Sequence, residues 1–325
     1  MRLSELFLTS TALSLGFLAA PVQAAQKWDM PLAYPAGNFQ SMNAAAFGTC
    51  VKDATAGEID IVTHPGGSLF KGNDIKRAVQ TGQTPIGERL LSAHENENPL
   101  FGLDSIPFLT DSYADSEKLW KAGRPELERV LDAQGLVLLY SVPWPPQGLY
   151  FKKDVGSVAD MAGVKVRSYN NSTGRMSELS GMVPVQIEAA EITEGLITGV
   201  IDSLITSAVT GQDSKAWEQL SHFYKVNAWQ PRNYVIVNKD AWSALDDKTK
   251  AAFMDCAAKA EANGVTMSKE SNDKALTDLE QHKMKVLDPS DKLAGELRKF
   301  GKTMTEEWKV KAGDAGKAVL DAYLK

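Results

Sequence analysis

The sequence predicts an α/β fold, because strand-like and helix-like segments alternate along the chain. The alternation is clearest over residues 163–205, where short apolar strands are separated by two amphipathic segments, and it recurs over residues 28–90. Strands that alternate with helices form βαβ units, so we expect parallel strands. With 325 residues, 43% of them hydrophobic, the chain is long enough for two lobes with separate cores.

The first 24 residues have the pattern of a signal peptide. Arg2 precedes a mostly apolar stretch over residues 6–20, and Val22-Gln23-Ala24 forms a plausible cleavage site. The apolar stretch is short and contains Thr and Ser, so an uncleaved membrane anchor is the weaker alternative. We expect cleavage after about Ala24 and a free, soluble mature protein in the periplasm.

The mature chain opens with the α/β alternation. Apolar residues recur with a period of 3.6 from Phe39 to Val51, which predicts a helix, and Gly57 ends it. The other elements expected in this part are strands at 28–33, 59–63 and 84–90 and a helix at 74–81. Beyond residue 160 we expect strands at 163–167, 184–187 and 200–205, helices at 173–181 and 190–198, a long helix at 247–281, and a helical tail at 291–324.

Two cysteines, Cys50 and Cys256, remain after processing. Export permits a disulfide, but each cysteine lies beside apolar residues in a helix-like stretch. We expect buried free thiols, with pairing as the open alternative. The two residues are too far apart in sequence for a local metal site.

Charge and motifs exclude several functions. The formal net charge of −6, without a basic stripe, argues against a nucleic-acid partner. No nucleophile elbow, phosphate-binding loop, dinucleotide fingerprint or C-x-x-C motif is present, so we expect no enzyme and no cofactor. His94 and Glu97 could be read as a metal loop, but a solvated acidic loop is the better interpretation, and we expect no metal.

The best candidate for a binding residue is Arg167. It falls near the carboxyl end of the strand at 163–167, on the same face as Lys165. Ligands of open α/β sheets bind at this edge, and a guanidinium matches a carboxylate with two parallel hydrogen bonds. The alternative is a surface arginine paired with an acid.

The order of these segments resembles the solute-binding proteins of tripartite ATP-independent periplasmic (TRAP) transporters, the C4-dicarboxylate-binding-protein family. The family's G-x-K-h-R strand is similar to residues 163–167, its G-h-h-D element to residues 199–202, and its P-F-L turn to residues 105–109. The resemblance covers nearly the whole mature chain. It implies that Arg167 clamps a carboxylate in a cleft and that the protein delivers its ligand to small and large permease subunits.

The resemblance also implies two lobes that are discontinuous in sequence. Residues 25–148 and 232–263 would form lobe 1, and residues 149–231 and 264–325 lobe 2. The helix at 247–281 would span both lobes, either as one extended helix or broken, with Asn263-Gly264 as the candidate position for a break. We expect a monomer. A sensor subunit that hands its ligand to a receptor kinase is an alternative.

Two departures from the family pattern bear on the ligand. Gln147-Gly148 or Tyr150 stands where many members have a second arginine, and Thr206 followed by Ser207 stands where many have asparagine. Both departures favour a monocarboxylate with neutral polar or aromatic substituents over a dianion. Trp144, in a proline-stiffened loop, could be a wall of the cleft or a core ring.

Glu88 could face Arg167 and bind a hydroxyl group or an amine, or it could form a surface salt bridge with Arg89, Lys76 or Arg77. Further candidates for the cleft are polar or aromatic residues near expected strand ends: Tyr34, Asn38, Tyr169, Asn170, Trp229 and Tyr234.

Overall fold

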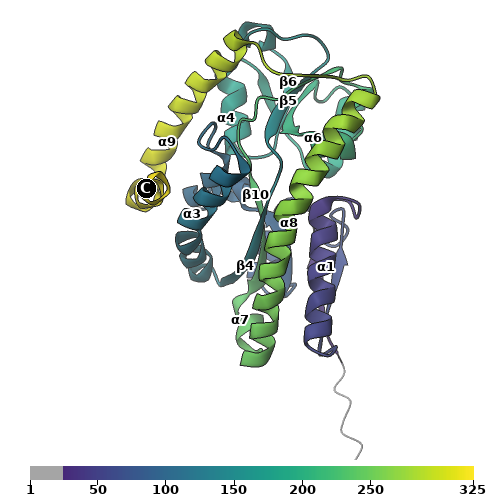
Figure 1. Ribbon diagram of the computed structural model, residues 1–325, viewed down its shortest axis with the longest axis vertical. Helices are drawn as coiled ribbons and strands as arrows, with labels where there is room; N and C mark the ends of the chain where they lie inside the picture. Colours follow the sequence, from purple (N-terminus) through teal and green to yellow (C-terminus); the bar gives the residue numbers. More distant parts are fainter. Residues whose placement is uncertain (1–24) are drawn as a thin grey trace, which may run out of the picture.

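The structure, a computed structural model, describes residues 25–325, so the predicted signal peptide and its cleavage site lie outside the described residues. The described chain is a mixed α/β protein with two groups of strands at opposite ends of an elongated molecule (Figure 1). Its larger helices are α1 (Phe39–Ala54), α2 (Gly72–Gln80), α3 (Tyr113–Ala133), α4 (Asn171–Leu179), α5 (Ile192–Ile197), α6 (Ala208–Asp213), α7 (Lys239–Ser243), α8 (Asp247–Gln281) and α9 (Asp291–Leu324).

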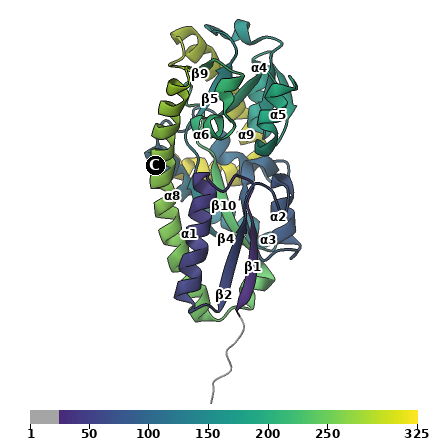
Figure 2. The ribbon, with the colours of Figure 1, turned by 90° about the vertical axis from the view of Figure 1, so that its right-hand side faces the viewer.

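The first group of strands forms the lower end of the molecule in Figure 2. Two strands pair in parallel, and β10 pairs antiparallel with a neighbour on each side, in the order β3-β10-β4. Their bounds are β1 (Gln26–Pro31), β2 (Ile59–His64), β3 (Ile86–Leu90), β4 (Leu136–Pro143) and β10 (Arg232–Asn238). The strand β4 lacks a counterpart among the strands expected above.

The second group is one six-stranded sheet with the order β11-β9-β5-β8-β6-β7. As the βαβ pattern predicts, β6 runs parallel to β7 and β8, whereas β5 runs antiparallel to β8 and β9. The chain crosses between the groups at two strands: β5 follows β4 of the first group, and β10 of the first group follows β9 of this sheet. The bounds are β5 (Gln147–Phe151), β6 (Lys165–Ser168), β7 (Val183–Gln186), β8 (Ser203–Ser207), β9 (His222–Tyr224) and β11 (Lys285–Leu287).

The expected strand at 200–205 begins later than predicted. Gly199 has a φ of +70°, which ends the preceding helix, and Val200 is exposed in the turn. Asp202 pairs with Lys152 at 2.7 Å and with Lys165 at 3.5 Å. The strand β8 therefore starts at Ser203 and extends to Ser207. The two candidate residues Thr206 and Ser207 both pair with β5.

The long helix α8 runs along both groups of strands, as predicted (Figures 1 and 2). Of the two alternatives, an extended or a broken helix, the structure shows the extended one, because α8 is continuous at Asn263-Gly264. Gly264 is needed for close packing instead: a Cβ atom at this position would collide with the side chain of Val142. Asn263 donates a hydrogen bond to Asn43 of α1 at 3.0 Å.

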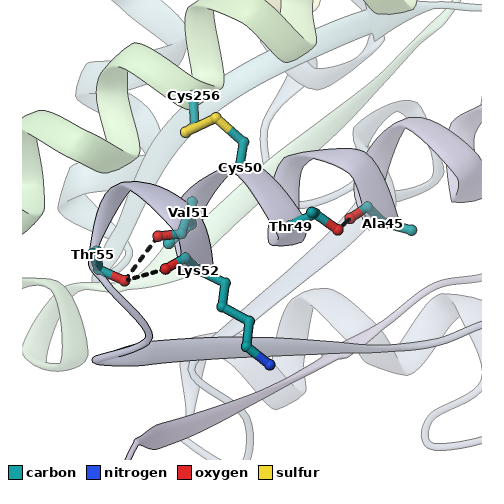
Figure 3. Close-up of a disulfide and its surroundings, with 7 residues drawn as sticks. All are labelled: Ala45, Thr49, Cys50, Val51, Lys52, Thr55 and Cys256. Atoms are coloured by element: carbon teal, nitrogen blue, oxygen red, sulfur yellow. Dashed lines mark hydrogen bonds between the residues drawn. A yellow bond between two sulfur atoms is a disulfide. The ribbon is translucent and has the colours of Figure 1, made fainter.

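Cys50 and Cys256 form a disulfide, which corrects the expectation of free thiols (Figure 3). The helices α1 and α8 pack side by side, and the two cysteines face each other with their Cα atoms 5.8 Å apart. Each position has the apolar surroundings from which we inferred a buried thiol. The contact between them, across 206 residues, depends on tertiary packing that the local sequence does not reveal.

The tail helix α9 breaks at Gly313, whose φ is +58°. Its second half packs against α3, next to the first group of strands. The indole of Trp308 donates to the carbonyl of Pro99 at 2.8 Å. Both α8 and α9 therefore connect the two ends of the molecule.

Candidate functional site

A cavity of about 290 Å³ lies between the two groups of strands. Its walls come from the ends of β3, β6 and β8, from the start of β5, and from segments next to β1, β4, β7 and β10. The lining residues are Tyr34, Leu90, Trp144, Gln147, Arg167, Tyr169, Ala189, Thr206, Thr210 and Pro231. Six of these ten were predicted as cleft residues.

Arg167 reaches the cavity from the third position of β6 and is 5% exposed. Its guanidinium carbon lies 4.8 Å from the centre of the Tyr169 ring, and its Nε donates to the carbonyl of Ile187 at 3.2 Å. Within residues 25–325 its terminal nitrogens make no hydrogen bond and no salt bridge. Burial lowers the pKa of Arg167, but an arginine still stays charged. The site therefore presents a desolvated cation whose two-pronged end is free for an anion.

A chain of hydrogen bonds fixes the wall beside Arg167. The indole nitrogen of Trp229 donates to the Tyr169 hydroxyl at 3.1 Å, and this hydroxyl donates to the Gln147 side-chain oxygen at 2.9 Å. The Gln147 amide nitrogen donates in turn to the carbonyl of Pro145 at 2.8 Å. Such a chain holds Tyr169 in one orientation, so the ring under Arg167 is preorganised.

The opposite wall is aromatic. The Tyr34 and Trp144 rings lie 4.7 Å apart in an edge-to-face arrangement, and Phe39 packs on Trp144 at 5.2 Å. The indole nitrogen of Trp144 donates to Asn233 at 2.8 Å. Trp144 is thus both a buried core ring and part of the wall. Burial raises the pKa of Tyr34 to about 12, so its hydroxyl is a neutral hydrogen-bonding group.

The end of β8 contributes hydroxyl groups. Thr206 and Thr210 line the cavity, whereas Ser207 caps α6: its hydroxyl accepts from the Thr210 amide at 3.2 Å. Ser207 therefore positions α6 and lies behind the lining residues.

The remaining predicted residues lie outside the lining, and most serve structural contacts. Asn38 caps α1 and donates to Asp213 at 2.7 Å, and Asn170 caps α4 and donates to Ser92 at 3.0 Å. Tyr234 donates to Asp104 at 2.9 Å in the second hydrophobic core.

Glu88 is 3% exposed and accepts a hydrogen bond from Asn233. Its burial raises the pKa of the carboxyl to about 7. It is neither a lining residue nor the surface salt bridge considered as the alternative, because β3 is covered on both faces. The lining residues without a prediction are Leu90, Ala189, Thr210 and Pro231.

Other kinds of site find little support in the described chain. His94 and Glu97 contact each other at 3.1 Å, but residues 25–325 hold no group of three or more metal-ligating side chains. Over the same range, no helix combines the length and the apolar composition needed to cross a bilayer.

Comparisons with known proteins agree with this geometry. A model of the bacterial extracellular solute-binding proteins, family 7, matches residues 33–312. A TRAP solute-binding protein from a marine metagenome, described as specific for pyroglutamate, is 49% identical with a TM-score of 0.91, covering 92% of this chain and 99% of that one.

Two further relatives bind small acids. The extracytoplasmic solute receptor DctP7 of Bordetella pertussis, which binds pyroglutamic acid, is 42% identical with a TM-score of 0.91, covering 93% of this chain and all of that one. The monocarboxylate 2-oxoacid-binding periplasmic protein of Nostoc sp. (strain PCC 7120) is 23% identical over 86% of this chain and 79% of that protein.

These matches extend over nearly all of the described chain and are to proteins that bind solutes for transport and are not enzymes. The family acts outside the cytoplasm together with membrane permease components. The chain belongs to the bacterial extracellular solute-binding proteins of family 7, the two-lobed receptors of TRAP transporters.

Proposed function

We propose that this protein captures pyroglutamate, or a cyclic monocarboxylate of the same size, and delivers it to a TRAP permease. The observation that carries the proposal is Arg167, a buried guanidinium with two free nitrogens facing a cavity of about 290 Å³. A single carboxylate satisfies this fork with two charge-assisted hydrogen bonds. Two relatives that are more than 40% identical bind pyroglutamate, which supports the choice of ligand.

The rest of the cavity suits a neutral ring with polar edges. Tyr34 and Trp144 offer flat aromatic surfaces, and Thr206 and Thr210 offer hydroxyl groups that both donate and accept. A lactam has one N–H donor and one carbonyl acceptor, which hydroxyls of this kind can match. A small amine is less well served, because Glu88 is directed to Asn233 and does not line the cavity.

The transport cycle follows from the position of the cavity. Lobe 1 comprises residues 25–148 and 232–263, and lobe 2 comprises residues 149–231 and 264–325, with the end of α9 returning to lobe 1. The ligand touches both lobes only when they are closed, so binding favours closure. The mature monomer, cleaved after about Ala24, then docks on the small and large permease subunits. The matches to transporter receptors favour this partner over a receptor kinase.

The direct test is binding by the mature chain after co-purified ligand has been removed by unfolding and refolding. Pyroglutamate, proline, 2-oxopentanoate and succinate are compared by thermal shift and calorimetry. We expect pyroglutamate to bind most tightly, adding about 2.7 kcal/mol of stability at 100 times its dissociation constant. Recovery of the acid chemically unchanged excludes turnover. Tighter binding of an open-chain acid would refute the choice of ligand.

A further inference from the structure

A second buried arginine lies at the rim of the cavity. Arg89 is the fourth residue of β3 and is 3% exposed, and the next residue, Leu90, lines the cavity. Across the cavity, Glu188 follows β7 and precedes the lining residue Ala189. The Glu188 carboxylate lies 3.6 Å from an Arg89 terminal nitrogen. This ion pair connects the two groups of strands.

The Arg89–Glu188 pair is poorly satisfied by its surroundings. Arg89 Nε and one Glu188 oxygen are buried without a hydrogen-bond partner in the described chain, while Arg89 donates to Asn73. Gly72 makes room for the pair, since a Cβ there would lie 2.7 Å from Glu188 Oε2 and 2.8 Å from Arg89 Nη1. An ion pair with incomplete hydrogen bonding, here between a buried arginine and a partly exposed glutamate, adds little stability. Stabilisation of the fold therefore does not explain the Arg89–Glu188 pair.

The charges around the cavity indicate a role for the Arg89–Glu188 pair in ligand selection. Arg167 and Arg89 contribute two positive charges and Glu188 one negative charge. Arg89 lowers and Glu188 raises the pKa of Arg167, so the three groups are close enough to interact. Glu88 lies on the face of β3 opposite Arg89 and accepts a hydrogen bond from Asn233; burial raises the pKa of its carboxyl to about 7, so it adds little negative charge below that pH. The three charges at the rim sum to one positive charge, which matches one carboxylate.

We propose that Glu188 is a specificity-determining residue: by occupying Arg89, it limits the cavity to ligands with a single negative charge. This inference rests on the proposed function and explains how a site with two arginines can prefer a monoanion. Without Glu188, Arg89 is a second cation beside the ligand, and the potential in a poorly solvated cleft rises accordingly. In the wild type, the negative charge of Glu188 would repel the second carboxylate of a dianion, and this repulsion would discriminate dianions from monoanions.

The test compares acids that differ by one carboxylate. 2-Oxopentanoate and 2-oxoglutarate share a carbon chain, and pyroglutamate serves as the third probe. In E188Q we expect the affinity for 2-oxoglutarate, relative to the two monocarboxylates, to rise at least tenfold by calorimetry. The matched control is E194Q, an exposed charge on the same helical segment, which leaves the ratio unchanged within twofold.

The reciprocal variant R89Q keeps the proposal testable if E188Q folds poorly. It leaves Glu188 near the cavity, so we expect monocarboxylate binding to weaken at least tenfold while binding of the neutral amide of pyroglutamate changes less than threefold. Circular dichroism checks folding. An unchanged ratio in folded E188Q, or equal weakening of acid and amide in R89Q, would show a purely structural pair and overturn the proposal. Failure of the wild type to bind pyroglutamate refutes the ligand assignment alone, because the two oxo acids still report charge selection.

Discussion

Two buried arginines, Arg167 and Arg232, occupy similar surroundings and have different roles. Each borders a small cavity, of about 290 Å³ and 280 Å³ respectively, and each guanidinium lies on an aromatic ring, 4.8 Å from Tyr169 and 5.1 Å from Trp120. Burial lowers the pKa of both. By burial and by aromatic contact alone, the two arginines cannot be told apart, although Asp104 lines only the cavity at Arg232.

The two arginines differ in how many of their donors form hydrogen bonds. Arg232 donates from Nε to the Ser141 hydroxyl at 2.8 Å, and its terminal nitrogens reach Ser116 at 3.4 Å and Glu117 at 3.5 Å. Arg167 uses only Nε, and its terminal nitrogens are free within the described chain. A buried cation becomes a receptor for ligand when its donors are left unpaired, and a structural element when the protein fills them.

The largest effect is expected for Arg167→Met. The substitution removes the free guanidinium, so affinity for the carboxylate ligand should fall by about 2–5 kcal/mol, measured by calorimetry. The free energy of unfolding should not fall by more than about 1 kcal/mol, because an unpaired buried charge contributes little to stability. Wild-type affinity would contradict the role of Arg167.

The same substitution at Arg232 should give the reverse result. Arg232→Met removes a guanidinium whose donors are filled, so we expect the free energy of unfolding to fall by about 3 kcal/mol in urea titrations. Affinity of the folded protein for the ligand should change less than twofold. Loss of binding without loss of stability would erase the distinction between the two regions.

Glu88 provides a test through pH. Burial raises the pKa of this carboxyl from 4.5 to about 7, so the folded state holds the proton more tightly than the unfolded state. The contribution to stability is full below pH 4.5 and is lost as the pH rises through 7. Glu88→Gln should remove this decline, worth on the order of 2–3 kcal/mol between pH 5 and pH 8. In the control E194Q the decline should persist.

The smallest effect is expected for Tyr169→Phe. The ring under Arg167 remains, while the hydroxyl that links Trp229 to Gln147 is lost. We expect the free energy of unfolding to fall by about 1 kcal/mol and the affinity to fall less than tenfold. A loss as large as that of Arg167→Met would show that the hydroxyl contacts the ligand directly.

Periodic elements could be predicted from the sequence. The long helix over 247–281 has the predicted bounds, and the βαβ arrangement of β6, β7 and β8 follows from their alternation with helices. The strand-end position expected for Arg167 agrees with its place in the lining of the cavity, while its role in binding stays a prediction. These features depend on local patterns, which a single sequence contains.

Features that depend on register or long-range contact could not be predicted. In β10, Asn233 contacts Trp144 and Glu88, whereas Tyr234 points to the other face, and a strand buried on both sides gives no sign of which face meets the cavity. Leu90 and Ala189 line the cavity because two separate segments meet there. The disulfide depends in the same way on the packing of α1 against α8.

The disulfide attaches the N-terminal part of α8 to α1 and leaves the rest of this helix without such an attachment. The bond between Cys50 and Cys256 holds the first third of the helix to α1, so this part must travel with lobe 1. We therefore expect a rotation that opens the cavity to be absorbed beyond Gly264 and in the short connections next to β5 and β10. Outside the cytoplasm a disulfide is stable, so we expect the motion of the two lobes to be centred nearer to the end of the molecule that carries Arg167.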